Sequence, residues 1–312
     1  MTKHVMLLPL CVACNTPDAV SLEDEFALRS STPVYLASVA GAIELDTYDT
    51  VAGKATTLSR LPESTPTVAP SRIRVCGDAV VAIVNNTVYY VPPFGSVPVA
   101  LYSEFSGILV DAVADDTNVY VLGWYHVGRV PLIGGAFEEL ASGIVGPEHI
   151  AMDAGNIYWA ATNDGLTQGP STNGTVTAVN KMGGAVSVVA SQLAEPHDIV
   201  ESNGHLYWLE SPPSDTTINV IDFDLATSAS AILVAALSEA RHLSVAAGSL
   251  FVAIQAHDIL SIPLDGTPPH NVYSADGQKI QGVLDYAADI SGLVIYGTGA
   301  DGHHRFVVAP IQ

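Results

Sequence analysis

A repeated pattern of two apolar runs joined by a glycine-containing turn extends along most of the chain. It is clearest at residues 149–159 and 198–208, where the second run contains Tyr-Trp. Such a pattern is typical of a β-hairpin. Successive hairpins start about 43 residues apart, which is the spacing of four-stranded propeller blades. The paired apolar anchors of the hairpins are Ala27/Val34, Ile73/Val80, Ala112/Val119, Ile150/Ile157, Ile199/Leu206, Leu243/Leu250 and Tyr286/Leu293.

A second hairpin follows the first in several units, with glycine in its turn at residues 91–96, 130–135, 179–184 and 262–267. Each unit is therefore expected to hold four strands, called A to D in chain order. One such sheet cannot bury both of its faces, whereas neighbouring sheets packed in a ring can. The sequence predicts an all-β fold, a seven-bladed β-propeller of four-stranded antiparallel blades, with boundaries near residues 68, 106, 146, 195, 239 and 278.

The two ends of the repeat region predict how the ring closes. In the last unit, strands A, B and C are expected near Val283, near Leu293 and at residues 305–309, and no strand D follows before Gln312. Residues 18–22 have no other place in the repeat, so we expect them to supply the missing outer strand. A simple linker is the alternative. Residues 15–312 are interpreted as a single β-propeller domain closed by the strand 18–22.

The first fourteen residues have the pattern of a bacterial export signal. Lys3 and His4 form a short basic region, residues 5–13 form an apolar one, and Val12-Ala13-Cys14 resembles the end of a lipobox. We therefore predict that residues 1–14 are a leader and that Cys14 is lipidated, which places the protein in the cell envelope. Plain secretion and an unprocessed start are the alternatives. The apolar run is too short to span a membrane, so membrane contact is expected only through the lipid anchor.

The charge of the chain excludes one class of partner. Acidic residues outnumber basic ones 32 to 11, which gives a formal net charge of −21. Binding to a phosphate backbone needs a basic surface, so no nucleic acid partner is expected. The simplest interpretation of the negative charge is that it keeps the protein soluble. The alternative, more specific interpretation is a surface that attracts cations. We expect a monomer.

The order of the strands assigns loops to faces. In a propeller, the D–A connections and the B–C loops open on one face, and strand A lines the central channel. Three consecutive connections carry histidines beside acidic and basic residues, and we expect these side chains to meet at one mouth of the channel. The candidate ligand-binding residues are Arg72, Glu148, His149, His197, Asp198, Arg241 and His242.

The chemistry of this set admits two ligands. Histidines beside carboxylates suit a divalent cation, and histidine also transfers protons near neutral pH. Arg241 repels a cation and favours an anionic ligand, so we rank a small anionic or polar ligand above a metal. The alternative is that polar residues merely occupy solvent-facing loops. An aromatic pair on a B–C loop, Trp124 and Tyr125, is a separate candidate contact for a partner.

Residues 156–159 and 205–208 resemble the repeat of the YWTD-type β-propellers of lipoprotein-receptor ectodomains, and they are more similar still to propellers of bacterial lipoproteins. Residues 146–150 and 195–199 are similar to blade starts in NHL-type propellers and streptogramin lyases. The resemblance implies a propeller over residues 24–312. Ala160-Ala161 and Leu209-Glu210 stand where the YWTD motif has threonine and aspartate, and no catalytic residue of these families can be placed.

These observations favour an extracytoplasmic binding or scaffold propeller that presents one polar face to a protein, peptide or sugar ligand. The alternative is a propeller-type lyase or lactonase with a channel-mouth His or Glu and a divalent metal, and a purely structural envelope component is a third reading. The sequence contains no serine-hydrolase elbow, HExxH motif or phosphate loop. It therefore identifies no cofactor, and binding is favoured over catalysis.

Overall fold

The computed structural model describes residues 26–29, 32–39, 42–49, 54–61, 72–76, 79–92, 97–105, 107–162, 172–212, 217–255, 257–274, 280–289, 292–299 and 304–309. These residues contain strands and no helix. They form six four-stranded antiparallel sheets and one three-stranded antiparallel sheet. In every sheet the strands lie side by side in chain order, as a repeated double hairpin predicts. The all-β class and the four-stranded antiparallel sheets are thus confirmed.

The strands are grouped as follows. The first three sheets contain β1 (Phe26–Arg29), β2 (Thr32–Val39), β3 (Ala42–Asp49) and β4 (Lys54–Arg60); β5 (Arg72–Cys76), β6 (Ala79–Val84), β7 (Thr87–Val91) and β8 (Val99–Ser103); β9 (Leu109–Ala114), β10 (Asn118–Gly123), β11 (His126–Pro131) and β12 (Glu138–Ser142). The fourth and fifth contain β13 (Pro147–Met152), β14 (Asn156–Ala161), β15 (Gly174–Asn180) and β16 (Ser187–Leu193); β17 (Pro196–Ser202), β18 (His205–Glu210), β19 (Thr217–Asp224) and β20 (Ala229–Ser238). The last two contain β21 (Arg241–Ala246), β22 (Ser249–Ile254), β23 (Asp258–Pro263) and β24 (His270–Ser274); β25 (Ile280–Asp289), β26 (Gly292–Gly299) and β27 (His304–Ala309).

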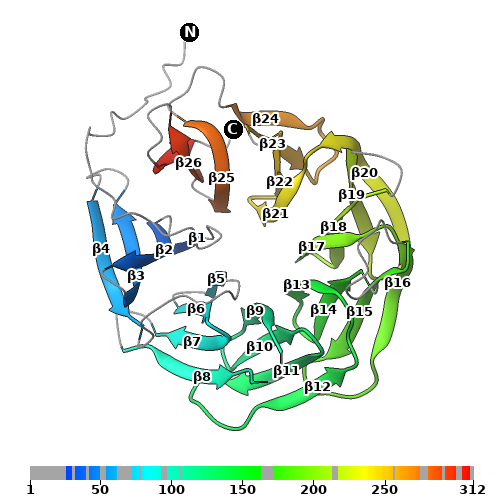
Figure 1. Cartoon of the computed structure of the whole chain (residues 1–312). Coiled ribbons are helices and arrows are strands. Elements are labelled where there is room, and N and C mark those ends of the chain that lie inside the picture. Colours follow the sequence, from blue (N-terminus) through cyan, green and yellow to red (C-terminus); the bar gives the residue numbers. More distant parts are fainter. Residues whose placement is uncertain are drawn as a thin grey trace.

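The sheets are arranged in a ring around a central space, with the first strand of each sheet nearest the centre (Figure 1). Each of these first strands contacts the first strand of the next sheet, and β25 contacts β1. The ring is therefore closed by contacts between the two ends of the described chain. All six predicted boundaries fall in the connections between sheets.

The last sheet has three strands within the described residues, and they correspond to strands A, B and C of the final unit. Residues 18–22, which are expected to add the fourth strand, lie outside the described residues. So do the predicted leader at residues 1–14 and its Cys14. A seventh blade of four strands, and closure of the ring by residues 18–22, remain predictions.

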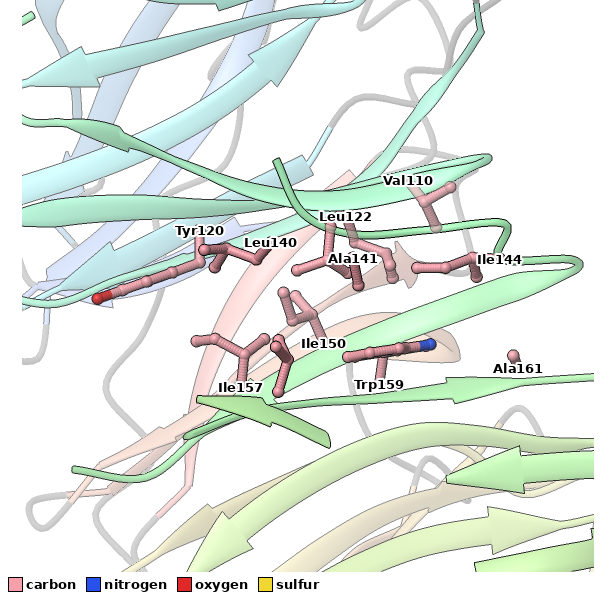
Figure 2. Close-up of a cluster of buried hydrophobic side chains, with 12 residues drawn as sticks. Val110, Tyr120, Leu122, Leu140, Ala141, Ile144, Ile150, Ile157, Trp159 and Ala161 are labelled. Atoms are coloured by element: carbon pink, nitrogen blue, oxygen red, sulfur yellow. The ribbon is translucent and has the colours of Figure 1, made fainter. Parts of the chain in front are cut away.

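The hydrophobic core lies between neighbouring sheets. Figure 2 shows the cluster between the third and fourth sheets, in which Leu140 of the third sheet and Ile144 of the following connection face Ile150 and Trp159 of the fourth sheet. Trp159, from the repeated Tyr-Trp pair, is 3 % exposed. Because each sheet buries an apolar face only against its neighbour, the hydrophobic effect favours the ring over isolated sheets.

The turn between the first two strands of a sheet carries a repeated polar contact. Asp153 accepts hydrogen bonds from the backbone N–H groups of Gly155 and Asn156, and the hydroxyl of Tyr158 donates to its Oδ2 at 2.6 Å. In the preceding sheet the hydroxyl of Tyr120 donates to Asp115 Oδ2 at 2.9 Å. The shared Asp-x-x-Asn-x-Tyr spacing ties the turn to the second strand, which helps to fix the register of the hairpin.

Candidate functional site

The D–A connections and the B–C loops meet at one end of the sheets, as the order of the strands predicts. In the third sheet, Trp124 N donates to Ile108 O at 2.8 Å and Ile144 N donates to Tyr125 O at 3.2 Å. The same link recurs as Thr162 N to Gly146 O, Ser211 N to Ala194 O and Gln255 N to Ser238 O. We call this end of the molecule the loop face.

His149 and Asp198 meet between the first strands of the fourth and fifth sheets. His149 Nε2 lies 3.3 Å from Asp198 Oδ1, and the backbone N–H of Asp198 donates to His149 Nδ1 at 3.3 Å. Because Nδ1 accepts a hydrogen bond, the neutral imidazole carries its proton on Nε2, where it faces the carboxylate. Both ring nitrogens of His149 are therefore engaged by Asp198.

The same carboxylate also reaches the sixth sheet. The backbone N–H of His242 donates to Asp198 Oδ2 at 3.0 Å. Asp198 and His242 have positive φ values of 51° and 55°, at points where a bulge interrupts the pairing of the first and second strands. Asp and His adopt this left-handed conformation more readily than most residues, but it still costs free energy. Asp198 therefore links β13 to β21, and it does so from within the β-bulge at the start of β17.

The charge of Asp198 is set by its surroundings. Burial by itself raises the pKa of this carboxyl group. The attraction of the carboxylate to the protonated forms of His149, His197 and His242, together with the hydrogen bond from His242 N, lowers the pKa more than burial raises it. The net result is a pKa below the ordinary value for aspartate, so the carboxylate is ionised although its side chain is only 13 % exposed.

Three other predicted residues lie one position earlier in the repeat than His149, Asp198 and His242. Glu148, His197 and Arg241 each precede the residues just described by one place, at the starts of β13, β17 and β21, and all three are half-buried. His197 Nδ1 donates to Glu195 O at 2.9 Å, so in the neutral ring Nε2 holds the lone pair. Arg72 begins β5, and its side chain is outside what the structure describes.

One buried residue of this ring was absent from the predicted set. Asp111, in β9, is fully buried, and its Oδ2 accepts a hydrogen bond from Ile150 N at 3.3 Å while Oδ1 accepts one from Ala112 N at 2.8 Å. Asp111 stands directly before the apolar anchor Ala112. His149, Asp198 and His242 hold the same place in their repeats. Aligning the repeats at that position would have revealed it.

Side chains at the loop-face ends of the first strands therefore form a continuous series of links. Asp111 connects β9 to β13, His149 connects β13 to β17, and Asp198 connects β17 to β21. The hydroxyl of Tyr286, in β25, donates to the backbone oxygens of His242 and Phe251. The polar residues at this mouth of the channel consequently hold neighbouring sheets together, in addition to any contact they make with a ligand.

The two aromatic residues of the loop face, Trp124 and Tyr125, have different surroundings. Trp124 is half-buried and packs against the cluster of Figure 2, so part of its ring belongs to the core. Tyr125 is 54 % exposed. Its ring lies against Gly107, where an added Cβ would stand 3.6 Å from the ring. Tyr125 therefore remains available for contact with a partner.

Other exposed apolar side chains surround Tyr125. Phe105 is 95 % exposed, and Ile108 and Val145 are 42 % and 40 % exposed. The backbone hydrogen bonds of the loop face hold the segments that carry them together. We call this surface the apolar patch: Phe105, Ile108, Trp124, Tyr125 and Val145. Exposed apolar side chains on adjoining loops of one face commonly mark an interaction site.

Two features of the described residues bear on other functions. No group of three or more His, Cys, Asp or Glu side chains there is arranged to hold a metal ion. No helix in the same part of the chain is long and apolar enough to cross a membrane. The contacts of Asp198 agree with the first finding, because its two oxygens face His149 Nε2 and His242 N.

No family model matches the chain, and no curated protein matches its sequence. Solved structures do match its fold. An oligogalacturonate lyase in complex with manganese has a TM-score of 0.66 at 11 % identity, covering 90 % of this chain and 86 % of that one. BamB from Moraxella catarrhalis has a TM-score of 0.55 at 13 % identity, covering 92 % and 84 %.

A nidogen/laminin complex has a TM-score of 0.53 at 15 % identity, covering 72 % of this chain and 90 % of that one. These structures confirm the resemblance to β-propellers. At such low identity the likeness shows the fold alone, and one propeller fold supports both binding and catalysis.

Proposed function

We propose that this chain is a seven-bladed binding propeller of the bacterial cell envelope, which holds a protein or peptide partner on its loop face. The observation that carries the proposal is the apolar patch. Phe105 and Tyr125 expose aromatic surface on the same face as Ile108 and Val145, and backbone hydrogen bonds join the loop of Tyr125 to the connections that carry Ile108 and Val145. Burying exposed apolar area is the main favourable term in protein association, and aromatic anchors commonly dominate it.

The mouth of the channel adds polar groups to this face. His149, Asp198 and His242 engage one another, and Glu148, His197 and Arg241 occupy the preceding repeat position. The guanidinium of Arg241 suits a carboxylate or another anionic group. We therefore assign the anchoring of the partner to the apolar patch, and the recognition of a polar or anionic group to the mouth.

The remaining parts of the proposal concern regions outside the described residues. Residues 18–22 supply the fourth strand of the last blade, and lipid on Cys14 attaches the protein to a membrane. Among structures of similar fold, one was solved as a nidogen/laminin complex, so a propeller of this general shape is compatible with a protein partner.

Site-specific photocrosslinking tests the loop face in the native envelope. A benzoylphenylalanine probe at Phe105 or Tyr125 is expected to form one discrete adduct. A probe at Ile133 serves as the control, because Ile133 is 96 % exposed in the β11–β12 turn, which joins the opposite ends of these strands. With the probe at Phe105, Ile108→Asp should abolish the adduct. Equal adducts at Ile133, or no adduct at Phe105 and Tyr125, would contradict the proposal.

A lyase or lactonase is the second candidate. The lone pair that the neutral ring of His197 holds on Nε2, close to the ionised Asp198, is the arrangement that favours it. An oligogalacturonate lyase shares the fold, so oligogalacturonate with added manganese is the first substrate to test, and a simple lactone is the second. Turnover that His197→Gln abolishes would support this reading, whereas turnover that survives the substitution would exclude it.

A further inference from the structure

A cavity of about 490 Å³ lies between the fourth and fifth sheets, and its lining includes neither the residues of the apolar patch nor those of the channel mouth. Its walls come from β16 on one side and from β18, β19 and β20 on the other. Ligand pockets commonly span about 300–1,000 Å³. The cavity is therefore large enough for a small organic molecule.

The neighbouring junction shows that the ring does not require this cavity. Between the third and fourth sheets, Leu140, Ala141 and Ile144 are 8 %, 7 % and 7 % exposed and pack into the cluster of Figure 2. The register places Ala190 where Ala141 stands in the preceding repeat. There, the corresponding Val189 and Leu193 are only half-buried, and all three line the cavity. At this junction the three residues pack against the buried cluster that contains Trp208 and Phe223, but they are less buried than their counterparts and leave a groove beside them.

The chemistry of the walls selects a class of ligand. The lining combines apolar side chains with four polar residues, Ser191, Glu210, Asn219 and Ser230, and Ile232 at the outer strand is 59 % exposed. Among the described residues that line the cavity, Glu210 alone carries a charge, and it holds the backbone N–H of Ala194 with its Oε1 at 2.8 Å. An occupant that complements this wall has an apolar body and a positive charge.

The indole of Trp208 forms part of the buried wall of this groove. Trp208 lines the cavity and is 1 % exposed, and its Nε1 has no hydrogen-bond partner among the described residues. A buried polar group in this state costs free energy, and such groups in native proteins usually have a structural or functional explanation.

We propose that this groove binds a small hydrophobic amine. Its apolar body packs against Val189, Leu193 and Ile232, above the indole of Trp208, and its ammonium group pairs with the carboxylate of Glu210. Aromatic rings in the wall add to the attraction of a cation. Glu210 lies next to the Ser211–Ala194 link of the loop face, but the groove shares no residue with the apolar patch, so binding of an amine is tested independently of the proposed function.

The test compares matched probes by nuclear magnetic resonance. The chain has three tryptophans, and Trp208→Phe identifies the indole N–H signal of Trp208. Titration with 1-naphthylmethylamine is expected to shift that signal selectively. The neutral analogue 1-naphthylmethanol should bind about tenfold more weakly, the size expected for one charge-assisted contact.

Two variants separate the site from general attraction to an acidic protein. Glu210→Gln should weaken binding of the amine about tenfold and leave the alcohol unchanged. Glu139→Gln removes the same charge from an exposed position on β12 and should change neither. Ala190→Phe, which fills the cavity, should abolish binding of both probes. Equal affinity for amine and alcohol, equal effects of the two glutamate variants, or no shift of the Trp208 signal up to the solubility limit would overturn the proposal.

Discussion

His149 Nε2 lies 3.3 Å from Asp198 Oδ1, so an imidazole of one sheet faces a carboxylate of the next. The same Asp198 accepts a hydrogen bond from the backbone of His242, one sheet further along. From the sequence alone, histidine and aspartate at the mouth of a channel indicate ligand binding or catalysis. In the structure they also hold three inner strands in position, and this structural role makes specific predictions.

Removing the carboxylate of Asp198 should destabilise the ring. In Asp198→Ala, the N–H of His242 and the imidazole of His149 lose their acceptor in a nearly buried setting. We expect the free energy of unfolding to fall by about 3–5 kcal/mol, as for loss of one partner of a buried pair. Urea denaturation measures it. Asp116→Ala, at an exposed position, is the control and should change stability by less than about 0.5 kcal/mol. Similar small effects of both variants would show that Asp198 does not hold the strands.

The contribution of Asp198 should depend on pH in a defined direction. Its pKa is lowered in the folded protein, so at acidic pH the unfolded chain binds more protons at this residue than the folded one does. The stabilisation is therefore complete above the unfolded pKa of about 3.9 and is lost as the pH falls through the folded pKa. The melting temperature of wild type minus that of Asp198→Asn should be largest near neutral pH and shrink below about pH 4. A difference that stays constant down to about pH 3 would contradict the ionised carboxylate.

Lys181 should contribute to stability at the opposite end of the sheets. Its side chain is buried, with Nζ 3.1 Å from Asp115 Oδ2 and 5.2 Å from the centre of the Tyr120 ring. Lys181→Met keeps the apolar stem and removes the charge, which leaves Asp115 without its cation. Thermal unfolding should show a loss of about 1–3 kcal/mol. Lys54→Met, at an exposed position, is the control, and equal stability of the two variants would refute the contact.

Deleting residues 18–22 tests the proposed closure. If this segment pairs with the third strand of the last sheet, near Phe306 to Val308, its loss exposes a strand edge and frees the end of the ring. We expect a lower melting temperature and faster proteolysis of residues 280–309. Deletion of residues 15–17 is the control and should change neither. An unchanged melting temperature after deletion of 18–22 would assign the segment to a linker.

Replacing Cys14 tests the predicted lipidation, because the lipid would be attached to its sulfur atom. In a bacterial host, the wild-type protein should incorporate labelled fatty acid and partition into detergent. Cys14→Ser should lose both properties, because the acceptor thiol is gone. Cys11→Ser keeps Cys14 and should retain them. Fatty-acid labelling of Cys14→Ser, or none of the wild type, would exclude a lipid anchor on this residue.

Much of the fold was predictable because its determinants are local. Hairpins follow from apolar runs separated by turn residues, and the predicted turns at 130–135 and 179–184 do join β11 to β12 and β15 to β16. The anchors of each hairpin do lie on adjacent strands, but the register was not predictable: Ala27 pairs with Val34, whereas Ile150 pairs with Trp159 and not with Ile157. The loop face also follows from chain order alone, as the hydrogen bond from Trp124 N to Ile108 O shows.

The candidate site was predictable only in part. Its residues were found because they precede strand A, but their roles depend on partners in other sheets. Asp198 contacts His149 and His242, which are 49 and 44 residues away along the chain. Asp111 was overlooked because a single aspartate within an apolar run gives no local sign of the backbone N–H that it meets. Trp124 was expected at a loop tip, and packing against the next sheet decides that it is half-buried.

The sequence by itself determined the repeating unit, the positions of its turns and the face on which each loop opens. These properties depend on residues only a few positions apart, whose alternation and turn preferences are written along the chain. The tertiary structure alone decided which junctions between sheets are filled. Leu140 is buried between the third and fourth sheets, while the corresponding Val189 is only half-buried against the cluster between the fourth and fifth and lines a groove there. That difference depends on how closely two whole sheets approach, and side-chain packing across a distance in sequence sets this approach.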